Sequence, residues 1–103
     1  MKKRPPSVTI LTQMIKDGWI GLHGTSAWAV YNVLFSYADW HTGGNCYPSY
    51  TKIHELTGLA RQTISNALKL LEESGEIIVH RHNSPLRHKQ NNYVIKRILE
   101  RTS

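Results

Sequence analysis

Residues 58–75 of this chain read GLARQTISNALKLLEESG, a stretch that begins and ends with glycine. Its apolar side chains recur at intervals of three and four residues, which is the spacing of one face of an α-helix. On a helical wheel this face consists of Ile64, Ala67, Leu68 and Leu71. Glycine is favoured in tight turns and directly after the C-terminus of a helix. The stretch therefore predicts a turn at residues 57–60 and then an amphipathic helix that ends at Gly75.

The opposite face of the predicted helix is polar and carries no acidic residue before Glu72. Gln62 and Asn66 lie almost opposite Ile64 on the wheel. The side chains beside them are Arg61, Thr63, Ser65 and Lys69. Gln and Asn can bond to N6 and N7 of adenine, and Arg can bridge O6 and N7 of guanine. This face therefore suits base edges in a major groove, although an ordinary solvated helix surface would have a similar composition.

The rest of the chain predicts a mainly helical protein with a small β-hairpin. Helices are expected at 8–16, 25–38 and 48–56, loops at 21–24 and 41–45, a minimal strand at 46–47, and strands at 77–82 and 92–96. Thr25 or Ser26 is expected to cap the second helix, because Ser and Thr are favoured at that position. Ile53 and Leu56 are expected to face the core. Residues 97–103 are expected to fray.

The predicted helix at 25–38 is apolar nearly all round, and its aromatic residues are Trp28, Tyr31, Phe35 and Tyr37. A helix of this kind either lies in the centre of a domain or shares one face with a partner chain. Both interpretations stay open at this point, because 103 residues can bury only a limited number of aromatic side chains.

The bulk composition favours a nucleic-acid partner. The chain has 13 Lys and Arg against 7 Asp and Glu, a formal net charge of +6 that suggests a polyanionic partner. Residues 77–99 carry cations and no acid. No secretory signal or membrane-spanning run is recognisable, and Cys46 is the only cysteine, so we expect a single domain in a reducing cytoplasm without disulfides.

Other chemistry finds little support in the sequence. His80, His82 and His88 share the expected hairpin, but metal binding needs convergent ligands, and no further thiol or carboxylate cluster accompanies them. No nucleophile–base pair, phosphate-binding glycine loop or carboxylate pair is recognisable. We therefore expect no catalytic activity, no metal and no cofactor.

The stretch YPSYTKIHELTGLARQTISNALKLLEESGEIIVHRH, with QNNYVI after it, resembles the winged helix-turn-helix domains of bacterial transcription regulators. It most closely resembles the small ones attached to phage and plasmid replication proteins. The resemblance covers residues 26–96. It implies one winged helix-turn-helix domain at 8–96, after a flexible basic arm at 1–7 and before a C-terminal tail at 97–103.

The resemblance also implies which residues contact DNA. Groove-reading positions correspond to Arg61, Gln62, Ser65 and Asn66, with Thr63 and Lys69 at the margins, and the hairpin or wing contributes Arg81, Arg87, His88 and Lys89. Two residues depart from the pattern. Ala60 stands where Ser or Thr usually caps the recognition helix, and His54 stands where a small residue usually lets the two helices cross closely.

We therefore predict a sequence-specific protein that binds double-stranded DNA and acts by occupying its site. It would be a small transcription regulator, or an accessory protein at a plasmid or phage replication or transfer origin. A homodimer is expected, with other replication or transfer proteins as possible partners and no membrane association. The alternative is a winged-helix protein–protein interaction module whose basic hairpin binds an acidic partner in a larger assembly.

Overall fold

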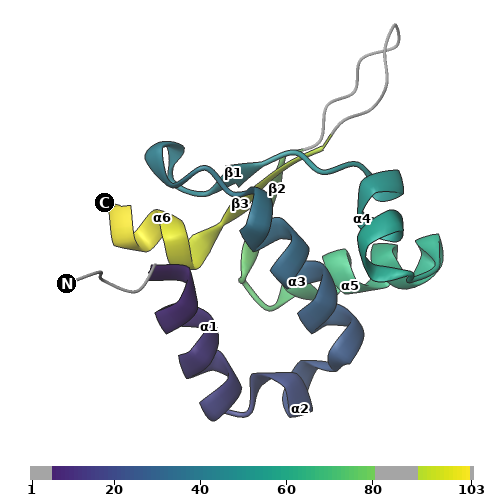
Figure 1. Cartoon of the computed structure of the whole chain (residues 1–103), viewed down its shortest axis with the longest axis horizontal. Coiled ribbons are helices and arrows are strands. Elements are labelled where there is room, and N and C mark those ends of the chain that lie inside the picture. The colour runs from purple at the N-terminus through teal and green to yellow at the C-terminus, as the bar shows by residue number, and fades with distance from the viewer. Residues whose placement is uncertain (1–5, 81–90, 103) are drawn as a thin grey trace, which may run out of the picture.

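The structure is a computed structural model that describes residues 6–80 and 91–102. Helices in these residues are α1 (Pro6–Lys16), α2 (Trp19–His23), α3 (Thr25–Tyr37), α4 (Tyr50–Thr57), α5 (Arg61–Glu73) and α6 (Lys96–Thr102), with a 3-10 turn, η1, at Trp40–Thr42. The strands are β1 (Asn45–Cys46), β2 (Ile77–His80) and β3 (Asn92–Ile95). Figure 1 shows the helices gathered below the sheet, with the N-terminus and α6 on one side and α4 on the other. No described helix is long and apolar enough to cross a membrane.

A small antiparallel sheet with the strand order β1-β3-β2 closes the domain. Tyr93 of the central strand pairs with Cys46 on one side and with Val79 on the other. Because β1 precedes α4 and β2 follows α5, the sheet joins the two ends of the helix-turn-helix segment. This mainly helical architecture with a three-stranded sheet is that of a winged helix-turn-helix, and the predicted fold class is confirmed.

Helix α3 lies in the centre of the molecule and packs against α2, α4, α5 and the sheet (Figure 1). Its buried residues are Ala27, Val30, Tyr31, Val33, Leu34 and Phe35. Trp28 is half-buried and packs against the core, with its ring 5.6 Å from that of Trp19. Tyr37 remains 46% exposed. The core interpretation is therefore confirmed for the aromatic residues of α3 other than Tyr37.

The predicted loop at residues 21–24 is wrong, because residues 19–23 form α2. Gly18 takes φ = +81°, which lets the chain reverse after α1, and the side chain of Trp19 then turns into the core. Burial of an indole ring outweighs the low helix propensity of Gly21. The predicted cap of α3 is also wrong: Gly24 is the N-cap residue, so neither Thr25 nor Ser26 caps the helix.

The expected fraying at the C-terminus is wrong as well, because β3 continues directly into α6. Ile98 of this helix is fully buried, and Arg97 pairs with Glu76. Gly44 takes φ = +96°, and its Cα lies so close to α6 that a Cβ there would be 2.9 Å from Cβ of Ile98. Close packing on Gly44, together with the Arg97 ion pair, fixes a segment whose sequence carries no strong helix signal.

Helix α4 begins directly after its N-cap residue, Ser49, whose hydroxyl accepts a hydrogen bond from the backbone N–H of Lys52 at 3.1 Å. Ile53 is fully buried, as predicted. The prediction for Leu56 is wrong, because its side chain is 55% exposed. Leu59, which follows the turn after α4, packs against the core.

Candidate nucleic-acid interface

Hydrogen bonds at both ends of the turn between α4 and α5 fix the position of α5 relative to α4. Gly58 takes φ = +73°, and its backbone N–H donates to the carbonyl of His54 at 2.8 Å. The hydroxyl of Thr57 donates to the carbonyl of Ile53 and accepts from the N–H of Leu59. His54, which was expected to affect the helix crossing, is exposed, and its Nδ1 lies 2.7 Å from the carbonyl oxygen of Leu59. These hydrogen bonds stabilise the turn between α4 and α5.

The apolar face of α5 is buried as predicted, and it fixes the helix against α3 and α4. Its buried residues are Ile64, Ala67, Leu68 and Leu71. Ala60 is the N-cap residue and makes no side-chain capping bond, as its sequence position implied. Figure 1 shows that α5 starts near α4, at the edge of the molecule opposite α6. The first turns of α5 therefore lie at the surface while its inner face is anchored.

The polar side chains of α5 fall into three groups. Gln62 and Asn66 are exposed and bonded to each other, with Nε2 of Gln62 donating to Oδ1 of Asn66 at 3.0 Å. Arg61 turns back to α4, where its Nη2 donates to the hydroxyl of Thr51 at 2.9 Å. The remaining predicted residues of this helix are Ser65 and Lys69, which line a cleft, and the half-buried Thr63.

The cleft lies where α4, α5 and the sheet meet. The residues that line it are Tyr50, Ser65, Leu68, Lys69, Val79, Asn91 and Tyr93. Asn91 donates from Nδ2 to the hydroxyl of Tyr93 at 3.5 Å. The sequence did not single out Tyr50, Asn91 or Tyr93 as site residues. They are distant along the chain, and only the pairing of β3 with β2 brings the latter two beside α5.

The predicted hairpin is described only at its base. There Ile77 pairs with Ile95 and His80 pairs with Asn92, which agrees with two antiparallel strands after the recognition helix. Four predicted DNA-binding residues lie outside the described residues, namely Arg81, Arg87, His88 and Lys89.

Within residues 6–80 and 91–102 no three His, Cys, Asp or Glu side chains converge on a metal position. Burial raises the pKa of the Cys46 thiol to about 12.

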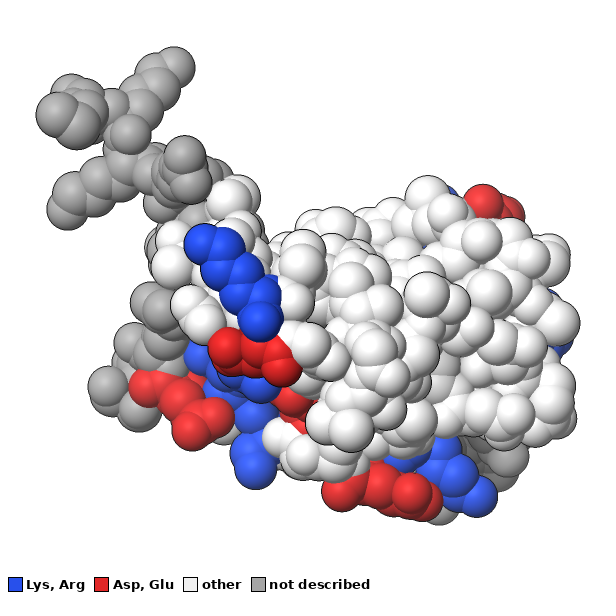
Figure 2. Space-filling model, turned by 90° about the horizontal axis from the view of Figure 1, so that it is seen from below, with Lys and Arg blue, Asp and Glu red and all other residues white. Residues whose placement is uncertain are grey.

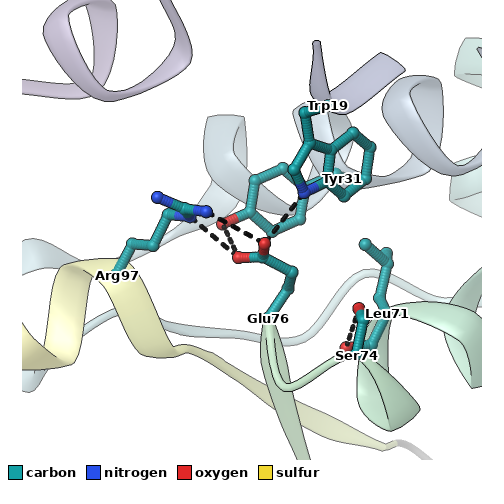
Figure 3. A network of polar contacts seen from close by, with 6 residues as sticks. All are labelled: Trp19, Tyr31, Leu71, Ser74, Glu76 and Arg97. Atoms are coloured by element: carbon teal, nitrogen blue, oxygen red, sulfur yellow. Dashed lines mark hydrogen bonds and ion pairs between the residues drawn. The ribbon is translucent and has the colours of Figure 1, made fainter. Parts of the chain in front are cut away.

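A buried carboxylate, Glu76, lies just beyond α5 and connects it to three other helices (Figure 3). Arg97 of α6 binds it through two hydrogen bonds, from Nε to Oε1 at 2.8 Å and from Nη2 to Oε2 at 3.0 Å. The indole N–H of Trp19 in α2 donates to Oε2 at 2.8 Å, and the hydroxyl of Tyr31 in α3 lies 3.4 Å from Oε1. The side chain of Glu76 therefore fixes the position of the C-terminal end of α5.

Opposing effects set the pKa of Glu76. Burial alone would raise the pKa of this carboxyl, but hydrogen bonds from Arg97 and Trp19, together with the charge of Arg97, hold it below its ordinary value. Burial, and after it the charge of Glu76, raises the pKa of Tyr31. The carboxylate is consequently ionised at neutral pH and the phenol is neutral. The sequence alone does not reveal this cluster, because its members are far apart in the chain and belong to different elements.

Comparison with known proteins agrees with this geometry. A family model described as a helix-turn-helix domain matches residues 24–77, from the residue before α3 to the first residue of β2. Searches of the curated proteins and of the solved structures found no match. The family match includes both helices of the motif, the turn between them and the central helix that supports them. The chain therefore belongs to the helix-turn-helix domain family.

Proposed function

We propose that this chain binds double-stranded DNA at specific sequences, with α5 in the major groove, and that it acts by occupying its site. The observation that carries the proposal is the exposed amide pair, Gln62 and Asn66, on a helix whose opposite face is fixed in the core. A helix held in this way presents its side chains without first having to be ordered, which favours specific binding.

The chemistry of the amide pair suits the edge of adenine. Adenine exposes an acceptor, N7, and a donor, N6, in the major groove, and one Asn or Gln can bond to both. Between the two side chains, Gln62 is the donor and Asn66 the acceptor. This arrangement leaves the N–H groups of Asn66 and the carbonyl oxygen of Gln62 available to a base.

The other predicted residues take supporting roles in this proposal. Those on α5 are Arg61, Thr63, Ser65 and Lys69, at the rim of the surface that carries the amide pair. The hairpin would add contacts to phosphate or to the neighbouring minor groove through Arg81, Arg87, His88 and Lys89. The assignment of the hairpin residues rests on sequence alone.

Site occupancy fits two biological roles. One is that of a small transcription regulator, and the other is that of an accessory protein at a replication or transfer origin, where other replication proteins would be its partners. Both require a chain that stays at one DNA site rather than one that acts on the DNA chemically.

We also propose that the chain binds DNA as a homodimer, because operators often have two-fold symmetry. The core takes up most of the aromatic residues of α3, so they do not supply the dimer surface. A better candidate is the side of the molecule that carries α2, where Figure 2 shows a wide area without Lys, Arg, Asp or Glu side chains. Leu22 of α2 is 80% exposed, and Ile15 of α1 is also exposed.

Selection of bound duplexes from a random-sequence pool tests the proposed function. We expect one motif to be enriched, and we expect the selected duplex to bind about 1000-fold or more tightly than a shuffled duplex at the same salt concentration. A dimer would give a motif with two symmetric half-sites about one helical turn apart. Equal binding of all duplexes would contradict sequence specificity. No retained duplex even at low salt would instead favour the protein-interaction module.

A further inference from the structure

The cleft between α5 and the base of the hairpin lies directly beside the amide pair. On the α5 wheel, Ser65 and Lys69 occupy the positions between the buried stripe and Gln62, so the exposed face continues from the amides into the cleft. Asn91 closes the cleft on the side of the sheet. A duplex that contacts Gln62 and Asn66 would therefore bring one of its strands over this opening.

The polar groups of the cleft are suited to an anion. Lys69 supplies a cation, and hydroxyl or amide N–H donors come from Ser65, Asn91 and Tyr50. No Asp or Glu lines the cleft, and Lys69 forms no ion pair with any residue in the described part of the chain. Within that part, the hydroxyl of Ser65 also forms no hydrogen bond. The floor is apolar and includes Leu68.

The size of the cleft limits what it can hold. Its volume is about 110 Å³, whereas pockets for small-molecule ligands usually measure about 300–1000 Å³. A nucleotide or a metabolite of similar size would not fit inside. A single phosphate group of a DNA strand, entering from the open side, would fit and would meet the cation and the neutral donors together.

We propose that this cleft binds one backbone phosphate of the DNA strand beside α5, with Lys69 as the cation and with Ser65, Asn91 and Tyr50 as neutral donors. The inference rests on the proposed DNA-binding function and assigns a new role to part of its surface. Ser65, a base-reading candidate on sequence grounds, becomes a phosphate contact. The phosphate fixes the register of α5 in the groove, and Gln62 and Asn66 provide the sequence information.

The first test compares Lys69→Ala with Lys16→Ala, using the selected duplex and a shuffled one. Loss of one phosphate contact should weaken binding of Lys69→Ala to both duplexes by the same factor. It should also reduce the slope of log K against log salt concentration by about 0.9 for each chain bound to the duplex. Lys16 is an exposed lysine at the end of α1, away from α4 and α5 (Figure 1), so Lys16→Ala removes the same charge without changing the slope. Equal slopes for the two variants would overturn the proposal.

Ser65→Ala separates a phosphate contact from base reading. If the Ser65 hydroxyl binds phosphate, its removal should weaken both duplexes equally and leave the ratio of selected to shuffled affinity unchanged. A fall in this ratio, confined to the selected duplex, would mean that Ser65 reads a base and would overturn its place in the cleft.

Neutral methylphosphonate linkages, placed one at a time along the selected duplex, locate the phosphate. For the wild-type protein, we expect one linkage in each half-site at which neutralisation weakens binding several-fold and whose effect disappears in Lys69→Ala. The Lys16→Ala variant should keep the wild-type pattern. If every linkage has the same effect in Lys69→Ala as in wild type, the phosphate site is wrong while DNA binding stands. If the wild-type protein binds no duplex at all, the proposed function itself fails.

Discussion

Replacing Glu76 by alanine is expected to lower the free energy of unfolding by about 3 kcal/mol. The change leaves Arg97 without its carboxylate and removes the acceptor of the buried indole N–H of Trp19. Removing one partner of a buried ion pair usually costs about 3–5 kcal/mol. The lower end of this range applies here, because the side chain of Arg97 is 40% exposed and its guanidinium can be hydrated when the carboxylate is absent. Urea denaturation at pH 7 measures the effect.

A second acidic residue near the end of α5 supplies the control. Glu73 is exposed, whereas Glu76 is buried three residues later. Glu73→Ala should change the free energy of unfolding by no more than about 0.5 kcal/mol, as is usual at the surface. Equal effects of the two substitutions would show that the buried cluster contributes nothing beyond general electrostatics.

The stabilisation by Glu76 should depend on pH. Its pKa in the folded protein is lower than in the unfolded chain, where the pKa of a Glu is about 4.3. Its contribution is therefore fully present above this value and is lost as the pH falls through the folded pKa. The gap in unfolding free energy between wild type and Glu76→Gln, which cannot titrate, should narrow below about pH 4. A gap that stays constant down to pH 3 would contradict a lowered pKa of Glu76 in the folded state.

Gly44→Ala is expected to destabilise the protein by about 3 kcal/mol, through two separate effects. A Cβ at this position would lie 2.9 Å from Cβ of Ile98 and 3.1 Å from the carbonyl oxygen of Ile95. Such overpacking usually costs about 1–3 kcal/mol. The positive φ of residue 44 adds about 1–2 kcal/mol for any residue with a side chain. Hydrogen exchange should also show reduced protection in α6, which packs on this glycine.

Gly58→Ala separates the two effects. Gly58 also has a positive φ, but a Cβ there would meet no atom within 4 Å. This variant should therefore show only the backbone cost, about 1–2 kcal/mol, and normal protection in α6. If Gly44→Ala is no more destabilising than Gly58→Ala, the close packing of α6 on Gly44 is not a significant constraint.

Features set by local sequence were the ones that could be predicted. The spacing of Ile64, Leu68 and Leu71 determines which face of α5 is buried, and Gly58 determines where the turn lies. The helices at residues 19–23 and 96–102 were missed, because burial of Trp19 and Ile98 against distant segments stabilises them. Periodicity and propensity carry no information about such contacts.

The residues of the candidate site also differ in whether local sequence could predict their placement. Exposure of Gln62 and Asn66 follows from their position opposite the buried stripe, so the sequence identified them. The sequence could not show that Ser65 turns toward a cleft, because the opposite wall of that cleft comes from the sheet. Asn91 is 26 residues further along the chain than Ser65, and only strand pairing brings it close.

The most direct test of base reading by α5 compares Asn66→Ala with wild type on the selected duplex and on a shuffled one. Asn66 lies opposite the buried face, so the variant should keep its stability within about 0.5 kcal/mol. Leu68→Ala, from the buried face, is the control and should lose about 2–5 kcal/mol of stability and bind both duplexes less well. Because a bidentate base contact discriminates by about 1–3 kcal/mol, Asn66→Ala should bind the selected duplex about tenfold or more weakly. We expect no change in its affinity for the shuffled duplex or in the salt slope, and an unchanged ratio of the two affinities would contradict base reading by this helix.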